Sequence, residues 1–529
     1  SFPTRRSSDL ESRFTETREQ AGQPLPFAGR SDSKSRTNYG RGHFSAVFDP
    51  TPKHTAGFDI EYTERSTHMP TLSRTTLGQT QSDSRYRQHM DGNTLTATAN
   101  YIWKIDTLGS QFKLIADYTR YTSDGDNSYH TTTCAPGTLR DSLYESATGS
   151  VYDILTADAG LTRKLPHGLT LRAGLRYTRN DMADKSRYAA QTQGTWLALP
   201  EYSYDQHYTE QIGAAYASLE YSAGRWELSA GLRGEYTSVA SQAFGRSYFG
   251  LFPNVSVSRA LNALRTWLLV AQWSRNIERP AFPALNPARI RISDYSWQSG
   301  NPSLRPTYIH RFSLTAVWKY RYTLTVGGNL HHDLIREIAH RDATAPDAVY
   351  IRPENHYTEN HWFVAASVPA KITRWWNLSV NAVGVMQRIR LNSTDSPATH
   401  YLMFADATCS FTLPAGFFAE AVYRAQSRLY SGNSEVGPRH TLSATVKKQL
   451  FGKRLTLFCT LSNITGCDWE FASLTDGMRR TIDARQAWSG RLWKAGAAWN
   501  FRAGKKFRAR TVESAAETQR KRLVKSTEQ

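Results

Sequence analysis

The chain has 529 residues and a formal net charge of +19, and aromatic residues make up 12% of it although hydrophobic residues reach only 40%. The sequence contains no run near the ~18 apolar residues that a spanning helix needs, and its aromatic content argues against disorder. The basic residues are scattered along the whole length without a nucleic-acid-binding motif, so we expect no nucleic-acid partner. What remains is an ordered chain rich in strand formers.

The N-terminal residues do not resemble the start of a natural domain. Residues 1–10 (SFPTRRSSDL) are similar to one reading frame of a short-read sequencing adapter, and they lack the apolar run of a signal peptide. We therefore expect residues 1–10 to be an artefact, with the native N-terminus, any export signal and any N-terminal domain lying upstream. Residues 11–41 are polar and rich in turn formers, which predicts the remnant of an external loop.

From about residue 42 onward, apolar and polar residues alternate with a period of two, which is typical of β-strands. The pattern is clearest in residues 94–105, 169–178 and 226–237. These predicted strands run to about ten residues or more, the length that a tilted strand needs to cross a bilayer. In residues 169–178, the alternation places Leu175 toward lipid and Arg176 toward the inside.

The connections between the predicted strands alternate between short and long. The short ones are residues 106–110, 164–168, 222–225, 319–321, 413–416 and 450–453. The long, polar ones include residues 65–92, 122–150, 180–206, 276–307 and 464–489. Short turns at one rim and long loops at the other predict an outer-membrane barrel with short periplasmic turns and long extracellular loops.

The predicted fold is therefore all-β, a large antiparallel transmembrane β-barrel over residues 42–501. The segmentation gives about 19 strands, whereas bacterial barrels usually have an even number, so we expect about three strands of a barrel of about 22 to precede residue 42. A seam should then open between residues 42–48 and residues 491–501. Residues 502–529 carry both charge signs, which predicts a charged C-terminal tail in the periplasm.

Charged residues recur on the inward face of the predicted strands. They are Lys113, Asp117, Arg172, Arg176, Glu227, Arg233 and Glu235. We expect them to line the lumen, where charge is tolerated and can be paired, and to contact an internal plug. The alternative is that they set the selectivity of an open pore.

The sequence gives no sign of catalysis or metal binding. It contains no GxSxG, HExxH or Walker A motif. His331 and His332 are adjacent, so on a strand they face opposite sides and cannot chelate a metal together. We expect no enzyme, no catalytic residue, no metal site and no cofactor. Cys134 and Cys467 lie in predicted external loops, and a disulfide between them is left open.

One long stretch carries a family resemblance. Residues 279–306 (RPAFPALNPARIRISDYSWQSGNPSLRP), with LFPNVSV at 251–257, GLRGEYT at 231–237 and RPEN at 352–355, resemble the barrel of a TonB-dependent-receptor-like outer-membrane family of Bacteroidota. The resemblance covers residues 43–529. The Gly and Pro residues of the long stretch most simply make turns, and direct ligand contact is the alternative.

The resemblance implies a barrel of about 22 strands around an N-terminal plug, in contact with outer-membrane lipid and energised by the TonB complex. It also implies uptake of a scarce, bulky nutrient such as a metal chelate, cobalamin or a glycan, whose identity the sequence does not give. The plug and TonB contact lie upstream in the family and have no counterpart in this chain. Phe501, at the end of the last strand, lies where family members carry an assembly signal. A passive pore or surface adhesin, and more remotely a soluble β-propeller, stay open as alternatives.

Overall fold

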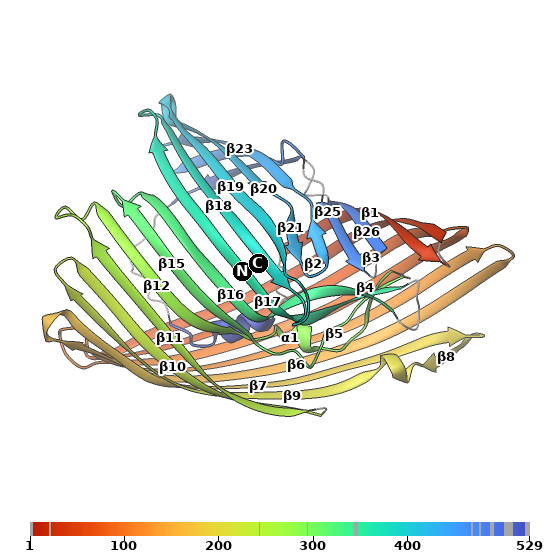
Figure 1. The fold of residues 1–529 in the computed structure, drawn as a ribbon, viewed down its shortest axis with the longest axis horizontal. Helices are drawn as coiled ribbons and strands as arrows, with labels where there is room; N and C mark the ends of the chain where they lie inside the picture. Colours follow the sequence, from red (N-terminus) through yellow and green to blue (C-terminus); the bar gives the residue numbers. More distant parts are fainter. Residues whose placement is uncertain are drawn as a thin grey trace.

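The computed structural model describes residues 4–20, 23–242, 244–293, 295–342, 348–466, 469–475, 478–486, 491–501 and 512–523. Within these residues, 27 strands form one sheet, which curves into a barrel (Figure 1). Consecutive long strands pair antiparallel, as β3 to β7 illustrate. The all-β class and the large antiparallel sheet predicted from the sequence are confirmed.

The first part of the sheet consists of long strands that lie side by side (Figure 1). They are β1 (Thr4–Gln20), β2 (Gln23–Thr51), β3 (His54–Leu77), β4 (Thr80–Lys104), β5 (Gln111–Ala135), β6 (Thr138–Leu165), β7 (Leu169–Thr192), β9 (Tyr204–Ala223), β10 (Trp226–Ser241), β11 (Gly245–Ala260) and β12 (Trp267–Glu278). The short strand β8 (Thr195–Ala198) pairs with the end of β7. Because β6 has 28 residues and about 9–11 cross a bilayer, much of this wall extends beyond any membrane.

The second part of the sheet has shorter strands. The strands that form its wall are β15 (Thr307–Trp318), β16 (Tyr322–Arg341), β17 (Val349–Lys371), β18 (Trp376–Arg390), β19 (Ala398–Leu413), β20 (Phe417–Gln426), β23 (Arg439–Leu450), β24 (Leu455–Ser462) and β27 (Leu492–Trp499). The remaining strands are β13 (Ile290–Ser293), β14 (Ser296–Gln298), β21 (Leu429–Ser431), β22 (Ser434–Val436), β25 (Trp469–Thr475) and β26 (Met478–Gln486).

The helices are short. They are α1 (Phe282–Leu285), α2 (Glu517–Arg520) and the 3-10 turns η1 (Pro166–Gly168), η2 (Pro200–Tyr202), η3 (Pro414–Gly416) and η4 (Lys521–Leu523). In the part of the chain that the structure describes, no helix has the length and apolar character needed to cross a membrane.

Polar segments that we expected to be loops continue the strands instead. Residues 65–92 form the β3–β4 hairpin and residues 122–150 the β5–β6 hairpin. Their hydroxyl groups pair across neighbouring strands, as between Ser84 and Thr131 at 3.0 Å. The sequence does not reveal these strands because both of their faces are polar, so no alternation marks them. We call this rim the hairpin end and the opposite rim the short-turn end.

At the short-turn end, a side chain closes the turn between β4 and β5. The Asp106 Oδ1 atom accepts hydrogen bonds from the backbone N–H groups of Leu108 at 2.9 Å and Ser110 at 3.0 Å. Hydrogen bonds from Ser110 also hold the pKa of Asp106 below its ordinary value of 3.8. The carboxylate therefore accepts hydrogen bonds from backbone N–H groups that have no backbone acceptor within the tight turn.

We expect replacement of Asp106 by Ala to lower the thermal unfolding midpoint near neutral pH. Because the pKa of the folded state is depressed, the stabilisation is present above the unfolded value and is lost as the pH falls below 3.8. The two proteins should therefore converge in acid. Thermal melts of both proteins across this pH range test this, with Asp106→Asn as the control that keeps an acceptor. Equal unfolding midpoints of the Asp106→Ala variant and the unaltered protein near neutral pH would show that the Asp106 carboxylate does not stabilise the turn.

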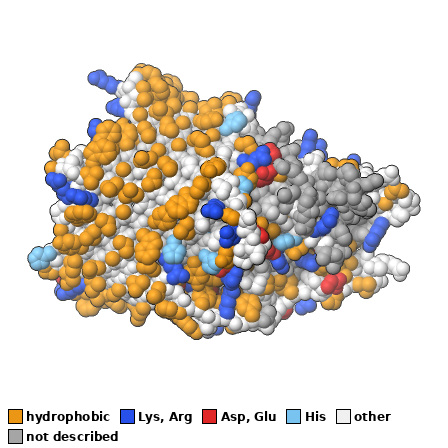
Figure 2. Space-filling view, in the orientation of Figure 1, with side chains coloured by type: hydrophobic (Ala, Val, Ile, Leu, Met, Phe, Trp, Pro, Cys, Tyr) orange, Lys and Arg blue, Asp and Glu red, His pale blue; other side chains and the backbone are white. Residues whose placement is uncertain are grey.

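The outer face of the barrel carries an apolar band. On β7, Leu175 is 65% exposed and alternates with Arg176, which bonds Asp158 on the inner face. Figure 2 shows hydrophobic side chains spread over much of one face, with Lys and Arg side chains at its margins. Toward the hairpin end the same outward positions become polar, as in the Arg179–Asp181 ion pair. A band of limited height on the outside of a barrel is what contact with lipid requires.

The start of the chain corrects one expectation. Residues 11–41, expected to be a loop remnant, form most of β1 and the first part of β2, and residues 10–16 of β1 also pair with β26. The barrel is thereby closed at the hairpin end, which removes the argument from an odd number of strands. Nearer the short-turn end, β1 stops opposite Tyr39. Residues 42–48 pair with β3 on one side and β27 pairs with β24 on one side. Among the described residues, no strand pairs with the other side of either, so the expected seam is open only at this end.

The end of the chain corrects another. We expected residues 502–529 to lie in the periplasm, but the described part, residues 512–523, lies against the inner wall of the barrel. A segment with both charge signs can be solvated in the periplasm or in the lumen, and in the lumen the charged inner wall also supplies ion-pair partners for it. Residues 502–511 and 524–529, and Cys467 of the possible disulfide, fall outside the described residues.

Candidate functional site

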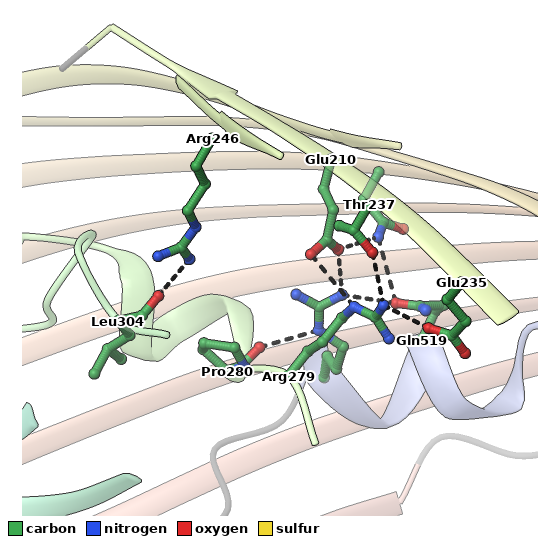
Figure 3. Close-up of polar contacts among 10 residues, drawn as sticks. Glu210, Glu235, Thr237, Arg246, Arg279, Pro280, Leu304 and Gln519 are labelled. Carbon is green, nitrogen blue, oxygen red and sulfur yellow. Dashed lines mark hydrogen bonds and ion pairs between the residues drawn. The ribbon is translucent and has the colours of Figure 1, made fainter. Parts of the chain in front are cut away.

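Buried charged side chains meet on the inner wall toward the hairpin end (Figure 3). We call Glu210 of β9, Glu235 of β10, Arg279, Gln519 and Arg522 the inner-wall cluster. All five are nearly fully buried, and Glu210 is only 2% exposed. Buried charges persist when they are paired and hydrogen-bonded, so the partners of each group define the site.

Arg279 links the two carboxylates. Its Nη2 atom donates to Glu235 Oε2 at 2.7 Å and to Thr237 Oγ1 at 2.9 Å, and its Nε atom lies 3.8 Å from Glu210 Oε1. Arg233 donates to the other oxygen of Glu235 at 2.5 Å. Arg279 follows directly after β12 and begins the long stretch that carries the resemblance, so the cluster fixes the start of that loop on the wall.

Arg522 satisfies the remaining oxygen of Glu210. Its Nη1 atom donates to Glu210 Oε2 at 2.5 Å, and its Nε atom donates to the carbonyl of Pro280 at 3.0 Å. The Nδ2 atom of Asn180 on β7 donates to the same Glu210 oxygen at 2.8 Å and to Gln519 Oε1 at 3.3 Å. Two distant parts of the chain, the β7–β10 wall and the C-terminal segment, thus share one hydrogen-bonded network.

An apolar cluster adjoins these charges. Its buried members are Tyr152, Ile154, Met182, Tyr208, Val239, Phe282, Leu285 and Leu304, and Leu523 packs against them. The guanidinium carbon of Arg522 lies 4.3 Å from the centre of the Phe282 ring in α1. A cation over an aromatic face is attracted to it, more strongly when water is excluded. The site therefore offers a carboxylate, a carbonyl and a ring to one guanidinium group.

The loop between β12 and β15 folds back on itself beside the cluster. The N–H of Gly300 donates to the carbonyl of Asn286 at 2.9 Å, and the N–H of Asn301 donates to Ala284 at 2.7 Å. The side chain of Asn301 reaches the carbonyl of Pro353 at 3.0 Å. These contacts support the interpretation that the Gly and Pro residues of this stretch make turns.

Gly300 leaves no room for a side chain. A Cβ atom there would lie 2.1 Å from the Asn286 carbonyl oxygen and 2.7 Å from that of Ala284, both of them backbone atoms. We expect Gly300→Ala to displace the loop and to make it more sensitive to protease added to whole cells. Gly384→Ala is the matched control, because nothing lies within 4 Å of the added atom. Equal cleavage in the two variants would show that the loop does not depend on this close approach.

The structure brings two of the predicted inward residues to the C-terminal segment. The Lys113 Nζ atom forms an ion pair with Glu513 at 2.7 Å. Asp117 accepts hydrogen bonds from the N–H groups of Ala515 at 2.7 Å and Ala516 at 3.1 Å. Their role toward a plug stays a prediction.

The other predicted residues are spread along the wall. Arg176 bonds Asp158 at 2.7 Å, Arg172 pairs with Glu220, and Arg233 and Glu235 belong to the network around Arg279. Glu227 is exposed near the short-turn end, and Phe501 is exposed just after β27. Only Glu235 of the predicted set is a member of the inner-wall cluster.

Glu210, Arg522 and Gln519 were not among the site residues predicted from the sequence, and Arg279 entered there only as the first residue of a turn-rich stretch. Glu210 lies in phase with Ile212 and Ala214, which are also buried on the inner face. The alternation of β9, extended beyond the apolar band toward the hairpin end, would have placed Glu210 on the inner face. No local signal links Arg522 to β9, because the contact joins residues 312 positions apart.

The structure gives no metal centre in the residues it describes, since no three His, Cys, Asp or Glu side chains are grouped to hold an ion. His331 Nδ1 and His332 Nδ1 instead contact the backbone carbonyls of Glu359 and Tyr357, at 2.7 and 3.0 Å. Another buried carboxylate, Glu359, lies away from the inner-wall cluster in sequence and is held by Arg336 at 2.8 Å and by Gln387 at 2.8 Å.

Comparisons with known proteins give a family match and several structural matches. A family model described as "Outer membrane protein beta-barrel family" matches residues 103–493. The ferric-catecholate import receptor Fiu from E. coli K12 is 9% identical with a TM-score of 0.52, covering 91% of this chain and 81% of that one. The ferric yersiniabactin uptake receptor FyuA from Yersinia pestis is 10% identical (TM-score 0.49; 92% and 80% covered). The siderophore receptor PirA from Pseudomonas aeruginosa is 12% identical (TM-score 0.43; 92% and 81% covered). A search of curated protein sequences gives no significant match.

Proposed function

Since the chain belongs to the outer membrane protein beta-barrel family, we propose that it forms the barrel of a receptor that imports a bulky nutrient through the bacterial outer membrane. The protein is an outer-membrane β-barrel whose fold resembles that of TonB-dependent receptors. Proteins of this family are typically transporters and not enzymes. The continuous sheet also excludes the β-propeller alternative, since each blade of a propeller is a separate sheet.

One observation carries the proposal: the barrel has an apolar outer band and an inner wall lined with charged groups that bind a peptide segment. An interior wide enough to hold residues 512–523 is suited to a bulky ligand. The nutrient class that we propose is a metal chelate, cobalamin or a glycan.

We further propose that the TonB complex supplies the energy for uptake. An outer membrane has no energy source of its own, and a lumen that is crossed by an internal segment does not favour free diffusion of a large solute. A passive pore and a surface adhesin are the alternatives that the experiment must separate from a receptor.

The test is uptake by the native bacterium. We expect deletion of the gene to abolish growth on one limiting chelate, cobalamin or glycan, and deletion of tonB to abolish uptake of the same nutrient. The intact gene supplied in trans should restore uptake. Uptake that survives loss of TonB would indicate a passive pore, and loss of surface attachment without loss of uptake would indicate an adhesin. Either result would contradict the proposal.

A further inference from the structure

The C-terminal segment follows the inner wall from one rim toward the other. Glu513 pairs with Lys113, near the short-turn start of β5. Ala515 and Ala516 bind Asp117, further along the same strand. Gln519 and Arg522 then reach Asn180 and Glu210, beyond the apolar band. Successive residues thus contact the wall at successive heights, so residues 512–523 form a strap along the lumen.

The two ends of this strap are held in different ways. Near its start, Asp117 is 1% exposed and accepts two backbone N–H groups, which does not depend on the side chains of the segment. At its end, the Arg522 side chain is 7% exposed, and its Nε atom donates to the Pro280 carbonyl while its Nη1 atom donates to Glu210 and to Gln519 of the segment itself. Its Nη2 atom has no hydrogen-bond partner among the described residues. The second contact is therefore specific for the chemistry of one side chain.

The partners of Arg522 match a guanidinium group. Glu210 accepts from Nη1, the Pro280 carbonyl accepts from Nε, and the guanidinium carbon lies 4.3 Å from the centre of the Phe282 ring. A guanidinium group is planar, presents several donors in a fixed fork and stacks on aromatic rings, whereas an ammonium is a compact, strongly hydrated charge. Lysine would offer one nitrogen where Arg522 uses two, Nε and Nη1.

We propose that the inner wall carries a guanidinium-binding site, formed by Glu210, Asn180, Pro280 and Phe282, and that its resident ligand is Arg522 of the chain's own C-terminal segment. The bound strap joins the short-turn end to the loop that follows β12, because Pro280 and Phe282 belong to that loop. Guanidinium groups of peptides are the ligand class that competes with Arg522. The inference does not depend on nutrient uptake.

Thiol labelling of the full chain in outer membranes tests the docked state. Ala516 is 0% exposed, whereas the Glu517 side chain is 71% exposed. With the natural cysteines replaced by Ser, we expect Ala516→Cys to react with a water-soluble maleimide at least about tenfold more slowly than Glu517→Cys. Equal rates would overturn the proposal, since they would place the segment away from the wall.

Second-site variants in the Ala516→Cys protein test the ligand. We expect Arg522→Ala, Arg522→Lys and Glu210→Gln each to raise the labelling rate by about tenfold or more. Arg522→Ala and Glu210→Gln leave a buried charge without this partner, and Arg522→Lys keeps the charge but replaces the fork of donors with a single nitrogen. Arg520→Ala is the matched control, since the only hydrogen bond of the Arg520 side chain in the contacts that the structure describes is to Ser514 of the segment itself. A rate unchanged by Arg522→Ala would overturn the proposal. Heat-modifiable gel migration checks that each barrel is folded.

A competition experiment on the unaltered site tests the ligand class. Arginine amide added to the Ala516→Cys protein should raise the labelling rate, and lysine amide at the same concentration should not. Equal effects of the two amides, or no effect of arginine amide at any concentration, would overturn the guanidinium assignment. None of these readouts changes if the barrel transports nothing, so failure here is distinct from failure of the uptake proposal.

Discussion

Replacing Arg279 with Ala should destabilise the barrel by about 3 kcal/mol, the lower end of the range for breaking a buried ion pair. Arg279 is the only residue of the inner-wall cluster that contacts both carboxylates in the described structure, through Glu235 at 2.7 Å and Glu210 at 3.8 Å. Without it, Glu210 and Glu235 stay buried with one cationic partner each, Arg522 and Arg233. Urea unfolding of the refolded barrel, followed by tryptophan fluorescence, measures the change.

The control for this variant is an exposed arginine on the next strand. Arg311 pairs with Glu278 at 2.7 Å, but both side chains are about half exposed. An ion pair on the surface contributes about 0–1 kcal/mol, because water solvates both charges well. Arg311→Ala should therefore have a small effect. If the two variants unfold at the same urea concentration, the inner-wall cluster is not a stabilising centre of the fold.

The second large effect is expected on the outer face. Leu175 lies in the apolar band and is 65% exposed, so Leu175→Arg would place a charge against lipid. Arg on the lipid face destabilises a barrel by about 2–4 kcal/mol at the bilayer midplane and by less near the interfaces. We expect a loss of about 2 kcal/mol or more in the free energy of unfolding, measured in lipid vesicles.

Leu139 provides the matched control for that substitution. It is 71% exposed, but as the second residue of β6 it lies beside the turn of the β5–β6 hairpin, away from the apolar band. A surface substitution outside special contacts usually changes stability by less than about 0.5 kcal/mol. Leu139→Arg should therefore be neutral. A neutral Leu175→Arg variant would mean that this face of β7 does not contact lipid.

The sequence predicts the walls of the barrel well because lipid and lumen make opposite demands on neighbouring residues. In β7, Leu175 and Arg176 could not exchange places without exposing the charge to lipid and the leucine to water. The alternation of apolar and charged residues therefore predicts which side chains face lipid and which face the lumen. The same reasoning locates Glu235 on the inner face of β10, where the structure finds it in the inner-wall cluster.

The remaining features are not encoded in local alternation. Residues 65–92 form strands whose side chains are mostly polar on both faces, buried ones such as Thr75 and Ser84 included, so their sequence resembles a loop. The inner-wall cluster depends on contacts between β9, the loop after β12 and the C-terminal segment. Arg522 has a charge that suits the periplasm and the lumen equally, and its partners in the fold, Glu210 and the Pro280 carbonyl, place it in the lumen.

The most direct test of the account is the accessibility of successive positions along β7 in the membrane. Nitroxide labels at residues 171, 173 and 175 and at residues 172 and 176 of the whole protein would be compared in lipid vesicles. The account predicts that the first set is relaxed by oxygen dissolved in the lipid and that the second set is not. Equal relaxation at neighbouring positions, or recovery of the protein in the soluble fraction, would contradict a barrel with an apolar outside and a charged inner wall.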